Sequence, residues 1–453
     1  MSDLESSVPP PDTHNRPATL RSIDKTSRHA LGASWLGWTF DGFETYALVL
    51  AGSAAVASVG TSDQIERLPA YVGALVAATL LGWALGGILA GFAADYLGRR
   101  RTLMISILWY AVFTGLTAFA PDYWWLLALR FITGMGLGAE WGSATALIGE
   151  LWPDRSRGRA AAVLQSGFGV GAVLAALTWF LLQPVGTEAW RYLFLVGALP
   201  ALIVLYVRRA VHDPEMWTEI RDRRRKAKAT AAGGGQVSPA DRELLRSTFT
   251  SVFSQPHLRQ RALRLLLITV VSVVGLYSVS AWIPQYTGQL AKSMGLPAGT
   301  WAANAGLVFN AASVPGYLLL GYLADKWGRK PTMLVYYAGS ALILPILFFA
   351  VSTPGAALVA AGVAGFFILG QFAWMPIYMP ELFPTAGRAT AISTVFNSAR
   401  IAGAIFTLAT GLLISVLGSI STAATTVGVA SYVIALGLVW FVGPETKGQP
   451  LPR

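Results

Sequence analysis

The sequence predicts an all-α membrane protein with twelve transmembrane helices, arranged as two six-helix halves related by an internal repeat. Three observations lead to this fold class: an apolar composition, twelve long apolar stretches, and three motifs that recur at a nearly constant spacing. An ordinary soluble domain is excluded, because its core needs a charged and polar shell that this chain cannot supply.

The composition narrows the class of protein. Of 453 residues, 54% are hydrophobic and 13% are charged, whereas about 25% of the residues of a typical soluble domain are charged. The chain has no cysteine, which excludes disulfide frameworks and thiolate metal sites. The four histidines lie in or beside polar segments, and the sequence shows no nucleophile–base set and no phosphate loop. We therefore expect no metal site, no cofactor and no enzymatic activity.

Twelve apolar stretches are long enough to cross a bilayer, for which about 20 residues are needed. Six of them precede a polar segment in the middle of the chain and six follow it. The expected spans cover residues 30–57, 70–93, 102–120, 122–148, 160–183, 190–208, 263–288, 301–323, 332–351, 355–378, 390–415 and 419–442.

The polar segments divide the chain into five parts. The N-terminal tail is polar and rich in proline, and it lacks the apolar core of a cleaved signal peptide. The middle segment contains the basic run Arg-Asp-Arg-Arg-Arg-Lys at 221–226. We expect a tail at 1–29, an N-terminal half at 30–208, a basic linker at 209–262, a C-terminal half at 263–443 and a tail at 444–453.

Basic residues are distributed unequally between the loops. Of 34 lysines and arginines, only Arg67, Arg191 and Lys292 fall in the loops of one side. Because cytoplasmic loops carry an excess of basic residues, the linker and both termini are expected in the cytoplasm, and the bacterial cytoplasmic membrane is the expected location. In such a chain the basic linker favours contact with the anionic headgroups of the lipid bilayer, and no nucleic-acid partner is expected.

Three motifs recur in the same order in both halves. The pattern Gly-x-x-x-Asp-x-x-Gly-Arg begins at residue 91, after the second span, and again at residue 321, after the eighth. Glu-Leu-Trp-Pro begins at residue 150 and Glu-Leu-Phe-Pro at residue 381, and Pro-Glu pairs begin at residues 214 and 444. A parallel repeat of this kind predicts two similar halves with a binding site between them near the midplane of the membrane.

Five charged residues fall inside expected spans: Asp41, Glu44, Arg130, Glu140 and Arg400. A charge at the centre of a bilayer costs about 2.5–3.5 kcal/mol or more, so such residues are functional candidates. Asp41 and Glu44 share one helix face, and two carboxylates in a low dielectric favour a group that binds and releases a proton. The alternative is a static ion pair with one of the two arginines.

Arg400 has no counterpart in the repeat, because residue 170 is a valine. A charge found in one half only suits a ligand site better than a shared gate. Its guanidinium could hold a carboxylate through two parallel hydrogen bonds, which makes an anionic substrate plausible on chemical grounds.

Glycines recur at four-residue intervals in two spans, at residues 134, 138 and 142 and at residues 167 and 171. Small residues at this spacing predict close packing between membrane helices.

The chain resembles the major facilitator superfamily over all twelve spans. The resemblance is carried by the paired Gly-x-x-x-Asp-x-x-Gly-Arg motifs, by Arg130 in Arg-Phe-Ile-Thr-Gly-Met-Gly-Leu-Gly, and by Pro-Glu-Thr-Lys-Gly at 444–448. It implies a secondary transporter whose two halves rock around a central site, for which one chain, a monomer, suffices. It also implies a part in proton coupling for Arg130.

Two further segments are similar to the organic-acid:proton symporters of this superfamily, both the aromatic-acid and the sialate/lactate groups. These segments are Asp-Gly-Phe-Glu at 41–44 and Gly-Ala-Glu-Trp-Gly at 138–142, although Glu44 stands where those families usually have aspartate. The similarity implies symport of a small organic acid with protons. The tail motif resembles sugar porters, so a proton-coupled sugar or polyol transporter and a metabolite exporter are the alternatives. The short cytoplasmic segments disfavour a non-transporting nutrient sensor.

The candidate site residues form three groups. The motif aspartates can accept hydrogen bonds from helix N-termini or pair with arginine, contacts that would hold a cytoplasmic gate shut. For proton coupling the candidates are Asp41, Glu44, Arg130 and Glu140; for substrate binding they are Arg400, Gln165, Gln285, Asn310, Gln371, Trp374, Tyr378 and Asn397; for gating they are Gly91, Asp95, Gly98, Arg99, Arg100, Glu150, Arg159, Gly321, Asp325, Gly328, Arg329, Lys330, Glu381 and Arg388.

Overall fold

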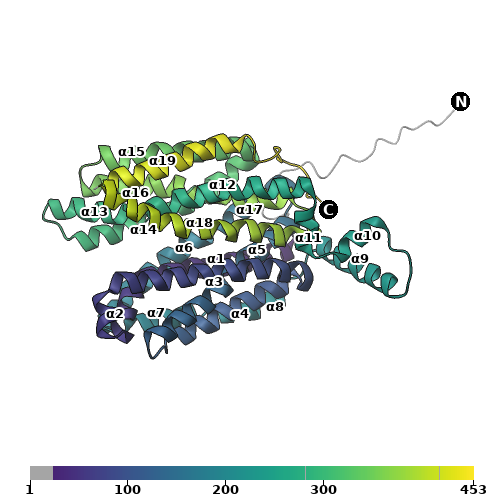
Figure 1. The fold of residues 1–453 in the computed structure, drawn as a ribbon, viewed down its shortest axis with the longest axis horizontal. Coiled ribbons are helices and arrows are strands. Elements are labelled where there is room, and N and C mark those ends of the chain that lie inside the picture. The colour runs from purple at the N-terminus through teal and green to yellow at the C-terminus, as the bar shows by residue number, and fades with distance from the viewer. Residues whose placement is uncertain (1–23, 281, 418, 453) are drawn as a thin grey trace, which may run out of the picture.

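A computed structural model describes residues 24–452, apart from 281 and 418, and it leaves undescribed the side chains of 404 and 406–417. Most of the expected tail at 1–29 lies outside the described residues. Throughout the described part of the chain the regular structure is helical. Figure 1 shows two bundles of helices side by side, the N-terminal half in purple and blue and the C-terminal half in green and yellow. The predicted all-α fold of two helical halves is confirmed.

The N-terminal half contains the six expected spans. Asp24 caps the first helix by accepting from the Thr26 N–H, so α1 begins five residues before the predicted start of the span. The helices are α1 (Lys25–Val59), α2 (Ser62–Glu66), α3 (Leu68–Leu97), α4 (Arg99–Thr117), α5 (Tyr123–Leu151), α6 (Arg157–Leu182), and the sixth span in two pieces, α7 (Ala189–Gly197) and α8 (Ala201–Ala210).

The C-terminal half repeats this order with more interruptions. Span ten is the most irregular, since prolines and glycines divide it into short α, π and 3₁₀ pieces. The elements are α12 (Pro256–Ser280), α13 (Trp282–Ser293), α14 (Ala298–Trp327), α15 (Arg329–Pro345), η5 (Ile346–Ala350), α16 (Pro354–Ala364), η6 (Gly365–Leu369), η7 (Gly370–Ala373), α17 (Trp374–Tyr378), η8 (Met379–Leu382), α18 (Arg388–Leu417) and α19 (Ile420–Val439).

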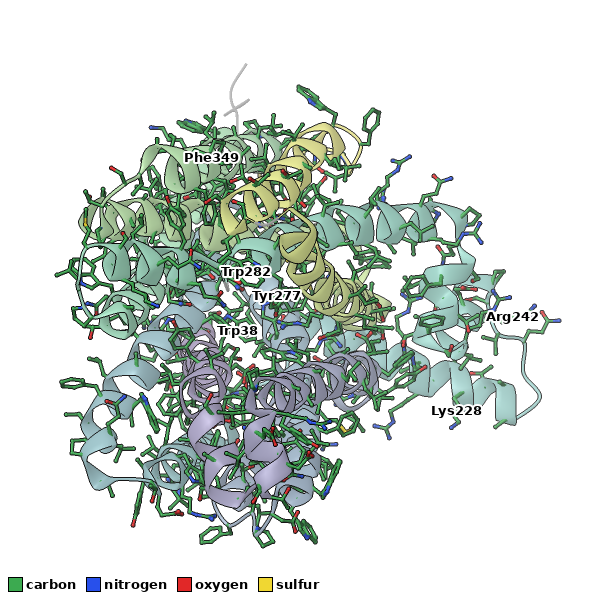
Figure 2. The ribbon with its side chains drawn as sticks, turned by 60° about the vertical axis from the view of Figure 1, so that its left-hand side comes forward. Trp38, Lys228, Arg242, Tyr277, Trp282 and Phe349 are labelled. Atoms are coloured by element: carbon green, nitrogen blue, oxygen red, sulfur yellow. The ribbon has the colours of Figure 1, made fainter. Side chains whose placement is uncertain are left out.

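The outer surface of the bundles suits a lipid environment. Within the described residues, nine helical segments are long and apolar enough to cross a membrane. Large apolar side chains are exposed in both halves, among them Phe180 and Leu181 in the N-terminal half and Phe349 in the C-terminal half. Figure 2 shows Phe349 on the outside of the bundle. Exposed apolar surface on this scale would be a liability in water but not in a bilayer.

The linker between the halves is folded. It contains α9 (Glu215–Ala232), α10 (Pro239–Leu245) and α11 (Thr248–Ser254), and α9 and α10 project from one end of the bundle in Figure 1. We call this end, which also carries the C-terminal residues, the linker end. Trp217 and Arg224 of α9 both donate to the Asp95 carbonyl at the end of α3, at 3.1 and 3.2 Å. The linker is therefore docked on the bundle.

The two halves meet mainly along two helix pairs, α3 with α18 and α6 with α14. Glycines make this approach possible. A Cβ on Gly91 would lie 2.7 Å from the Ser393 Cβ, and one on Gly321 would overlap the Ala162 Cβ. The predicted glycine stripes pack closely too, since a Cβ on Gly138 would overlap the Trp83 carbonyl oxygen of α3.

Candidate functional site

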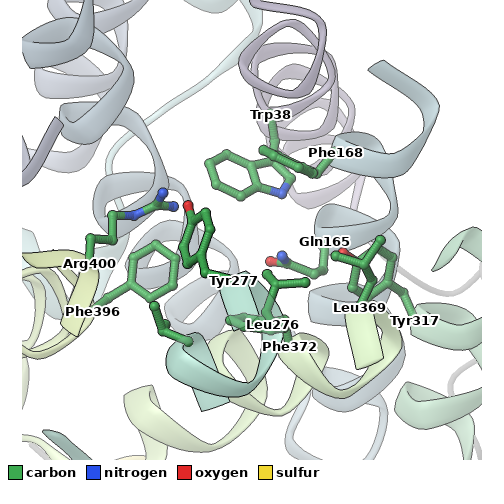
Figure 3. Close-up of a pocket in the computed structure, with 11 residues that line it drawn as sticks. Trp38, Gln165, Phe168, Leu276, Tyr277, Tyr317, Leu369, Phe372, Phe396 and Arg400 are labelled. Carbon is green, nitrogen blue, oxygen red and sulfur yellow. The ribbon is translucent and has the colours of Figure 1, made fainter. Parts of the chain in front are cut away.

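A cavity lies between the two halves, where α1, α6, α12, α14, α18 and the irregular part of span ten meet (Figure 3). Its volume is about 60 Å³. The irregular backbone matters here, because η6 and η7 bring Leu369 and Phe372 into the wall. The lining residues are Trp38, Gln165, Phe168, Val273, Leu276, Tyr277, Tyr317, Leu369, Phe372, Phe396 and Arg400.

Arg400 of α18 lies in this wall and connects the halves. Its guanidinium carbon is 3.9 Å from the ring centre of Trp83, on α3 of the other half, and 4.6 Å from that of Phe396. The guanidinium also interacts electrostatically with the Tyr277 hydroxyl, toward which it points in Figure 3, and with Asp41. Its buried Nε has no hydrogen-bond partner among the described residues. The cation is therefore held by ring faces and keeps hydrogen-bonding capacity.

Two of the predicted intramembrane carboxylates are buried without ion-pair geometry. Asp41 is fully buried, and neither of its oxygens has a hydrogen-bond partner in the described part of the chain. Its strongest charged neighbours are Glu140 and Arg400. Glu140 is also fully buried, packs against Gly37 of α1 and interacts with the Tyr110 hydroxyl. Buried carboxylates inside a membrane span are functional candidates.

The third carboxylate, Glu44, is paired. Arg130 Nη1 lies 3.0 Å from Glu44 Oε2, with both side chains buried. Arg130 also donates to Thr117 and Thr133 at 2.6 and 3.1 Å, and its guanidinium lies over the Phe194 ring. The structure thus divides the predicted proton-coupling group into a static ion pair of Glu44 with Arg130 and an unpaired couple of Asp41 with Glu140.

The other predicted substrate-binding residues are scattered. Gln165 lines the cavity, and its Oε1 accepts from Trp141 Nε1 at 3.1 Å. Asn310 and Asn397 donate to carbonyls of their own helices, both at 2.8 Å. Gln371 and Trp374 are buried in span ten and do not line the cavity.

Two of these predicted residues lie away from the cavity. Tyr378 lies near the linker end, where its hydroxyl donates to the Pro444 carbonyl at 2.6 Å. Gln285 lies on α13 with its side chain exposed. In this structure neither position offers a contact to a molecule in the cavity.

The first motif aspartate joins the halves at the linker end. Asp95, at the end of α3, accepts from the Thr390 N–H and the Thr390 hydroxyl, at 2.9 and 2.7 Å, in the first turn of α18. It also lies 3.0 Å from Arg99 Nη1. A carboxylate at a helix N-terminus is favoured by the free N–H groups and by the helix dipole.

The second motif aspartate makes the equivalent contact on the opposite side. Asp325, at the end of α14, accepts from the Gly158 and Arg159 N–H groups in the first turn of α6, at 3.0 and 3.1 Å. It also lies 3.3 Å from Arg329 Nη1. Each half therefore caps a helix of the other half with the aspartate of its repeated motif.

Two buried ion-pair networks complete the linker end. Glu150 pairs with Arg99 of its own half at 2.9 Å and with Arg388 of the other half at 2.7 Å. In the equivalent network, Glu381 pairs with Arg329 at 2.6 Å and with Arg157 at 3.3 Å. Both networks cross between the halves, so this end of the molecule is closed in this state.

One residue of these networks, Arg157, is missing from the predicted set. Arg157, which lies 231 residues before Arg388, takes the role equivalent to that of Arg388, whereas the predicted Arg159 contacts Asp325 with a half-exposed side chain. The sequence did contain a signal for Arg157, because the spacing that relates Glu150 to Glu381 also relates Arg157 to Arg388. The aromatic residues that line the cavity, and Trp83 against the Arg400 guanidinium, carried no such signal in the sequence.

The remaining motif residues lie at the start of α4 and α15. Gly98 and Gly328 have φ of 103° and 112°, a conformation that favours glycine. Acidic residues from distant segments cap the two helices that begin here. Asp213 accepts from the Arg100 N–H at 2.9 Å, and Glu445 accepts from the N–H groups of Arg329 and Lys330 at 2.9 and 3.0 Å. Glu445 of the second Pro-Glu pair thus caps α15, whereas α4 is capped by Asp213, the residue before the first Pro-Glu pair.

Two helical halves that enclose a cavity and are joined by symmetric charge networks at one end define a membrane transporter of the major facilitator class. Residues 29–453 match the family model described as sugar (and other) transporter, and the chain belongs to this family. The predicted superfamily is therefore confirmed, and the family implies a small-molecule substrate.

The relatives are bacterial transporters. The chain is 34% identical to a putative metabolite transport protein of Haemophilus influenzae, over 93% of this chain and 97% of the relative. It is 29% identical to a probable 4-methylmuconolactone transporter of Cupriavidus pinatubonensis, over 92% and 90%. It is 28% identical to a sialic acid transporter of Escherichia coli, over 85% and 87%.

Among solved structures, the fold is similar to that of a major facilitator superfamily proton:xylose symporter, XylE, bound to 6-bromo-6-deoxy-D-glucose. The TM-score is 0.76 and the sequence identity 20%, over 94% of this chain and 98% of the other. This likeness establishes the fold.

Proposed function

We propose that the protein carries a small organic acid across the bacterial cytoplasmic membrane together with protons, by alternating access. The single observation that carries the proposal is the position of Arg400, a buried cation in the wall of the central cavity that also interacts with Asp41. A neutral substrate would gain little from a buried guanidinium, whereas a carboxylate could form two hydrogen bonds with it. Relatives named for sialic acid and 4-methylmuconolactone support an acidic substrate.

The coupling step follows from competition for Arg400. Without substrate, Arg400 interacts with Asp41 and offsets part of the cost of burying that carboxylate. When a substrate carboxylate binds the guanidinium, Asp41 loses part of this stabilisation and takes up a proton together with Glu140. The loaded site is then nearly neutral, which lowers the cost of moving it past the apolar gate. Glu44 and Arg130 form a fixed ion pair behind this site.

The linker end supplies the gate in this proposal. Its basic residues, the linker and both termini face the cytoplasm, as the excess of arginine and lysine at this end favours. Opening breaks the contacts of Asp95 and Asp325 with the helix N-termini of the opposite half and separates both ion-pair networks. The gate residues are thus those of the repeated motifs, together with Arg157.

Uptake into proteoliposomes tests the proposal. Radiolabelled organic acids and sugars are offered with and without an inward proton gradient, to the wild type, to Asp41→Asn and Glu140→Gln, and to the exposed control Glu66→Gln. We expect gradient-driven uptake of an acid by the wild type and the control, and loss of the gradient dependence in both buried variants. Uptake of a neutral sugar, or uptake of an acid at the same rate with and without the proton gradient, would contradict the mechanism.

Arg400→Lys tests the role of the guanidinium. Lysine keeps the positive charge but lacks the planar fork and the flat face that packs between Trp83 and Phe396. Its matched control is Arg67→Lys, since Arg67 is exposed and pairs with Asp63 at the far end. We expect a rise in the apparent KM of at least about tenfold for Arg400→Lys, corresponding to roughly 1.4 kcal/mol, and no change for Arg67→Lys.

A further inference from the structure

A second cavity lies at the linker end and shares no lining residue with the central one; we call it the linker cavity. Its volume is about 340 Å³, and small-molecule sites typically measure about 300–1,000 Å³. Its walls come from four parts of the chain: the linker helices α9 to α11, the start of α12, the segment 384–387 before α18, and the C-terminal tail at Pro452. The linker cavity is therefore large enough for a small molecule outside the transport site.

Two arginines in the walls of the linker cavity have no acidic partner. Arg224 of α9 and Arg261 of α12 are half-buried, and within the described residues neither forms an ion pair. Arg224 donates to carbonyls of α10 and α3 at 3.0 and 3.2 Å, and Arg261 donates to a carbonyl of η8 at 3.2 Å. The carboxylate in the wall, Glu243, pairs with Arg246 instead, at 3.2 Å. Because half-buried charges are costly without a counter-charge, this arrangement favours an anion in the cavity.

Another hollow at the same end provides a contrast. It is lined by Arg159, Arg329 and Asp325, among others. Both arginines lie 3.3 Å from Asp325 oxygens, so their charges are already matched within the protein. An anion would gain less there than between Arg224 and Arg261.

The groups that line the linker cavity suit a phosphate group. A guanidinium presents a planar fork of N–H groups that matches phosphate geometry, and a phosphate monoester carries about −1.5 to −2 charges at pH 7, which two arginines can balance. His257 of α12 adds its ring nitrogens. The wall also contains the apolar side chains of Leu244, Val252 and Leu258. A phosphate that carries an apolar substituent therefore fits this lining better than a bare phosphate.

The linker cavity lies directly behind the gate. Ala386 and Pro452 belong to its wall. Next to Ala386, the Thr385 carbonyl accepts from Arg99 of the other half at 3.1 Å, and the Pro452 carbonyl accepts from Arg388 at 2.7 Å. The wall of the cavity and the ion-pair networks of the gate thus share the same short backbone segments.

A phosphate bound to both arginines would connect the two halves. Arg224 belongs to α9, which is docked on the Asp95 carbonyl at the end of α3, whereas Arg261 belongs to α12 of the C-terminal half. Opening of the gate withdraws the end of α3 from the C-terminal half and takes Arg224 away from Arg261. A ligand that needs both arginines binds the closed form better, and it shifts the equilibrium toward that form.

We infer that the linker cavity is a regulatory site for a phosphate group, and that its occupation holds the linker end closed and slows the transport cycle. The phosphate belongs either to a small phosphate monoester or to the headgroup of an anionic lipid, since both present the same oxygen atoms. The inference goes beyond the proposed function, because it concerns a second site and holds for any substrate of the central cavity.

Titration calorimetry on the purified full chain in detergent tests the site. The probes are phenyl phosphate, inorganic phosphate and phenol. We expect phenyl phosphate to bind more tightly than inorganic phosphate, and phenol to give no measurable binding. Arg261→Gln removes one cation but keeps a donor for the η8 carbonyl, and it should weaken the binding of phenyl phosphate about tenfold or more. The control is Arg264→Gln, exposed on the same helix and outside the lining, which should bind like the wild type.

A second variant fills the linker cavity without removing a charge. Ala240 is exposed and belongs to the lining, so Ala240→Trp should fold and should also weaken the binding of phenyl phosphate. Its control is Ala231→Trp, exposed on α9 and outside the lining. Equal affinity in the wild type, Arg261→Gln and Ala240→Trp would place the ligand elsewhere and overturn the inference.

An introduced thiol reports closure of the linker end. Ser393 is buried where α18 meets α3, so Ser393→Cys reacts with a maleimide reagent when the gate opens. Phenyl phosphate should slow this reaction about fivefold or more, and it should have no effect when Arg261→Gln is also present. Binding of phenyl phosphate with an unchanged reaction rate would disprove the regulatory role.

Lipid nanodiscs distinguish the two sources of the phosphate. The same thiol reaction is measured in phosphatidylcholine nanodiscs with and without phosphatidic acid. If phosphatidic acid slows the reaction, the slowing is lost in Arg261→Gln, and phenyl phosphate does not bind, the site takes a lipid headgroup. If neither compound slows the reaction, the inference is wrong.

Neither readout involves transport, so the outcomes also separate this inference from the proposed function. If the thiol reaction responds as expected, but acid uptake is the same with and without a proton gradient, the linker cavity is a regulatory site and the proposed symport is wrong. If uptake is driven by the gradient and the thiol reaction does not respond, the symport stands and this inference fails.

Discussion

At the scale of single residues, the three buried carboxylates differ in whether they have an ion-pair partner. Glu44 is matched by Arg130, whereas Asp41 and Glu140 are buried and have no ion-pair partner among the described residues. Removing one member of a buried ion pair leaves the other charge uncompensated, which typically costs about 3–5 kcal/mol. Neutralising an unpaired carboxylate removes a desolvated charge and carries no such cost.

This contrast predicts opposite effects on stability. Glu44→Gln should lower the free energy of unfolding by about 3–5 kcal/mol, because Arg130 is left buried and unpaired. Asp41→Asn should leave stability unchanged or raise it, while abolishing proton-driven uptake. Thermal unfolding in detergent measures the stability of both variants, and uptake into proteoliposomes measures the loss of transport in Asp41→Asn.

The control for Glu44→Gln is Glu188→Gln, which removes a half-exposed carboxylate that pairs with Arg191 at the far end of the bundle. Exposed pairs are worth about 0–1 kcal/mol. Equal losses of stability in Glu44→Gln and Glu188→Gln would show that the buried pair is not the fixed element described here.

At the scale of elements, close helix packing explains the glycine pattern. Gly138 of α5 faces the Trp83 carbonyl of α3, with no room for a methyl group, whereas Gly73 of α3 has nothing within 4 Å of its missing Cβ. The two positions are therefore a matched pair for the same substitution.

We expect Gly138→Ala to force α3 and α5 apart and to lower the melting temperature and the uptake rate together. Gly73→Ala should be neutral or stabilising by up to about 1 kcal/mol, since alanine is the better helix former. Melting curves and initial uptake rates check the prediction. Full activity of Gly138→Ala would show that the two helices can separate without consequence.

The linker also acts as an element, and Arg224 contributes to its docking together with Trp217. Arg224 of α9 donates to the carbonyls of Leu244 and Asp95 and lies 4.6 Å from the centre of the Tyr96 ring. Arg224→Ala should release α9 and α10 and increase the rate of limited trypsin cleavage in the linker by several-fold. The neighbouring exposed Arg225 supplies the control, Arg225→Ala, which removes one cleavage site and should not accelerate cleavage elsewhere.

At the scale of the whole molecule, the twofold repeat makes closure of the linker end a shared property of both halves. Asp95 and Asp325 hold helix N-termini on opposite sides of the pseudo-twofold axis. A hydrogen bond to a charged group contributes about 1.5–3 kcal/mol, so losing either one shifts the equilibrium between closed and open forms by roughly tenfold or more.

The absence of cysteine allows this shift to be measured with one introduced thiol. Ser393 is buried between Gly91 and Gly142 in the closed state, so Ser393→Cys should react slowly with a maleimide reagent. We expect Asp95→Asn and Asp325→Asn each to accelerate the reaction about tenfold or more. Ala231→Cys, exposed on α9, should react at the same rate in every background, and an unchanged rate for Ser393→Cys would argue against a gating role.

The sequence alone predicted the span positions, the repeat and the superfamily, because hydropathy and motif spacing are local properties of the chain. It also pointed to all five intramembrane charges, since a charge in an apolar stretch is visible without any structure. It left open which acid pairs with which arginine. It placed Tyr378 and Gln285 among the substrate contacts, although both lie outside the cavity, and it missed Arg157 in the gate.

Tertiary structure decided those points, because they depend on which side chains meet across helices. Glu44 and Arg130 are 86 residues apart in sequence, and Trp83 reaches Arg400 from the other half of the molecule. The aromatic walls of the cavity assemble from six spans, none of which shows a distinctive pattern by itself. Sequence by itself therefore determined that this protein is a two-half membrane transporter, and only the packing of the halves decided which side chains surround the cavity and close the linker end.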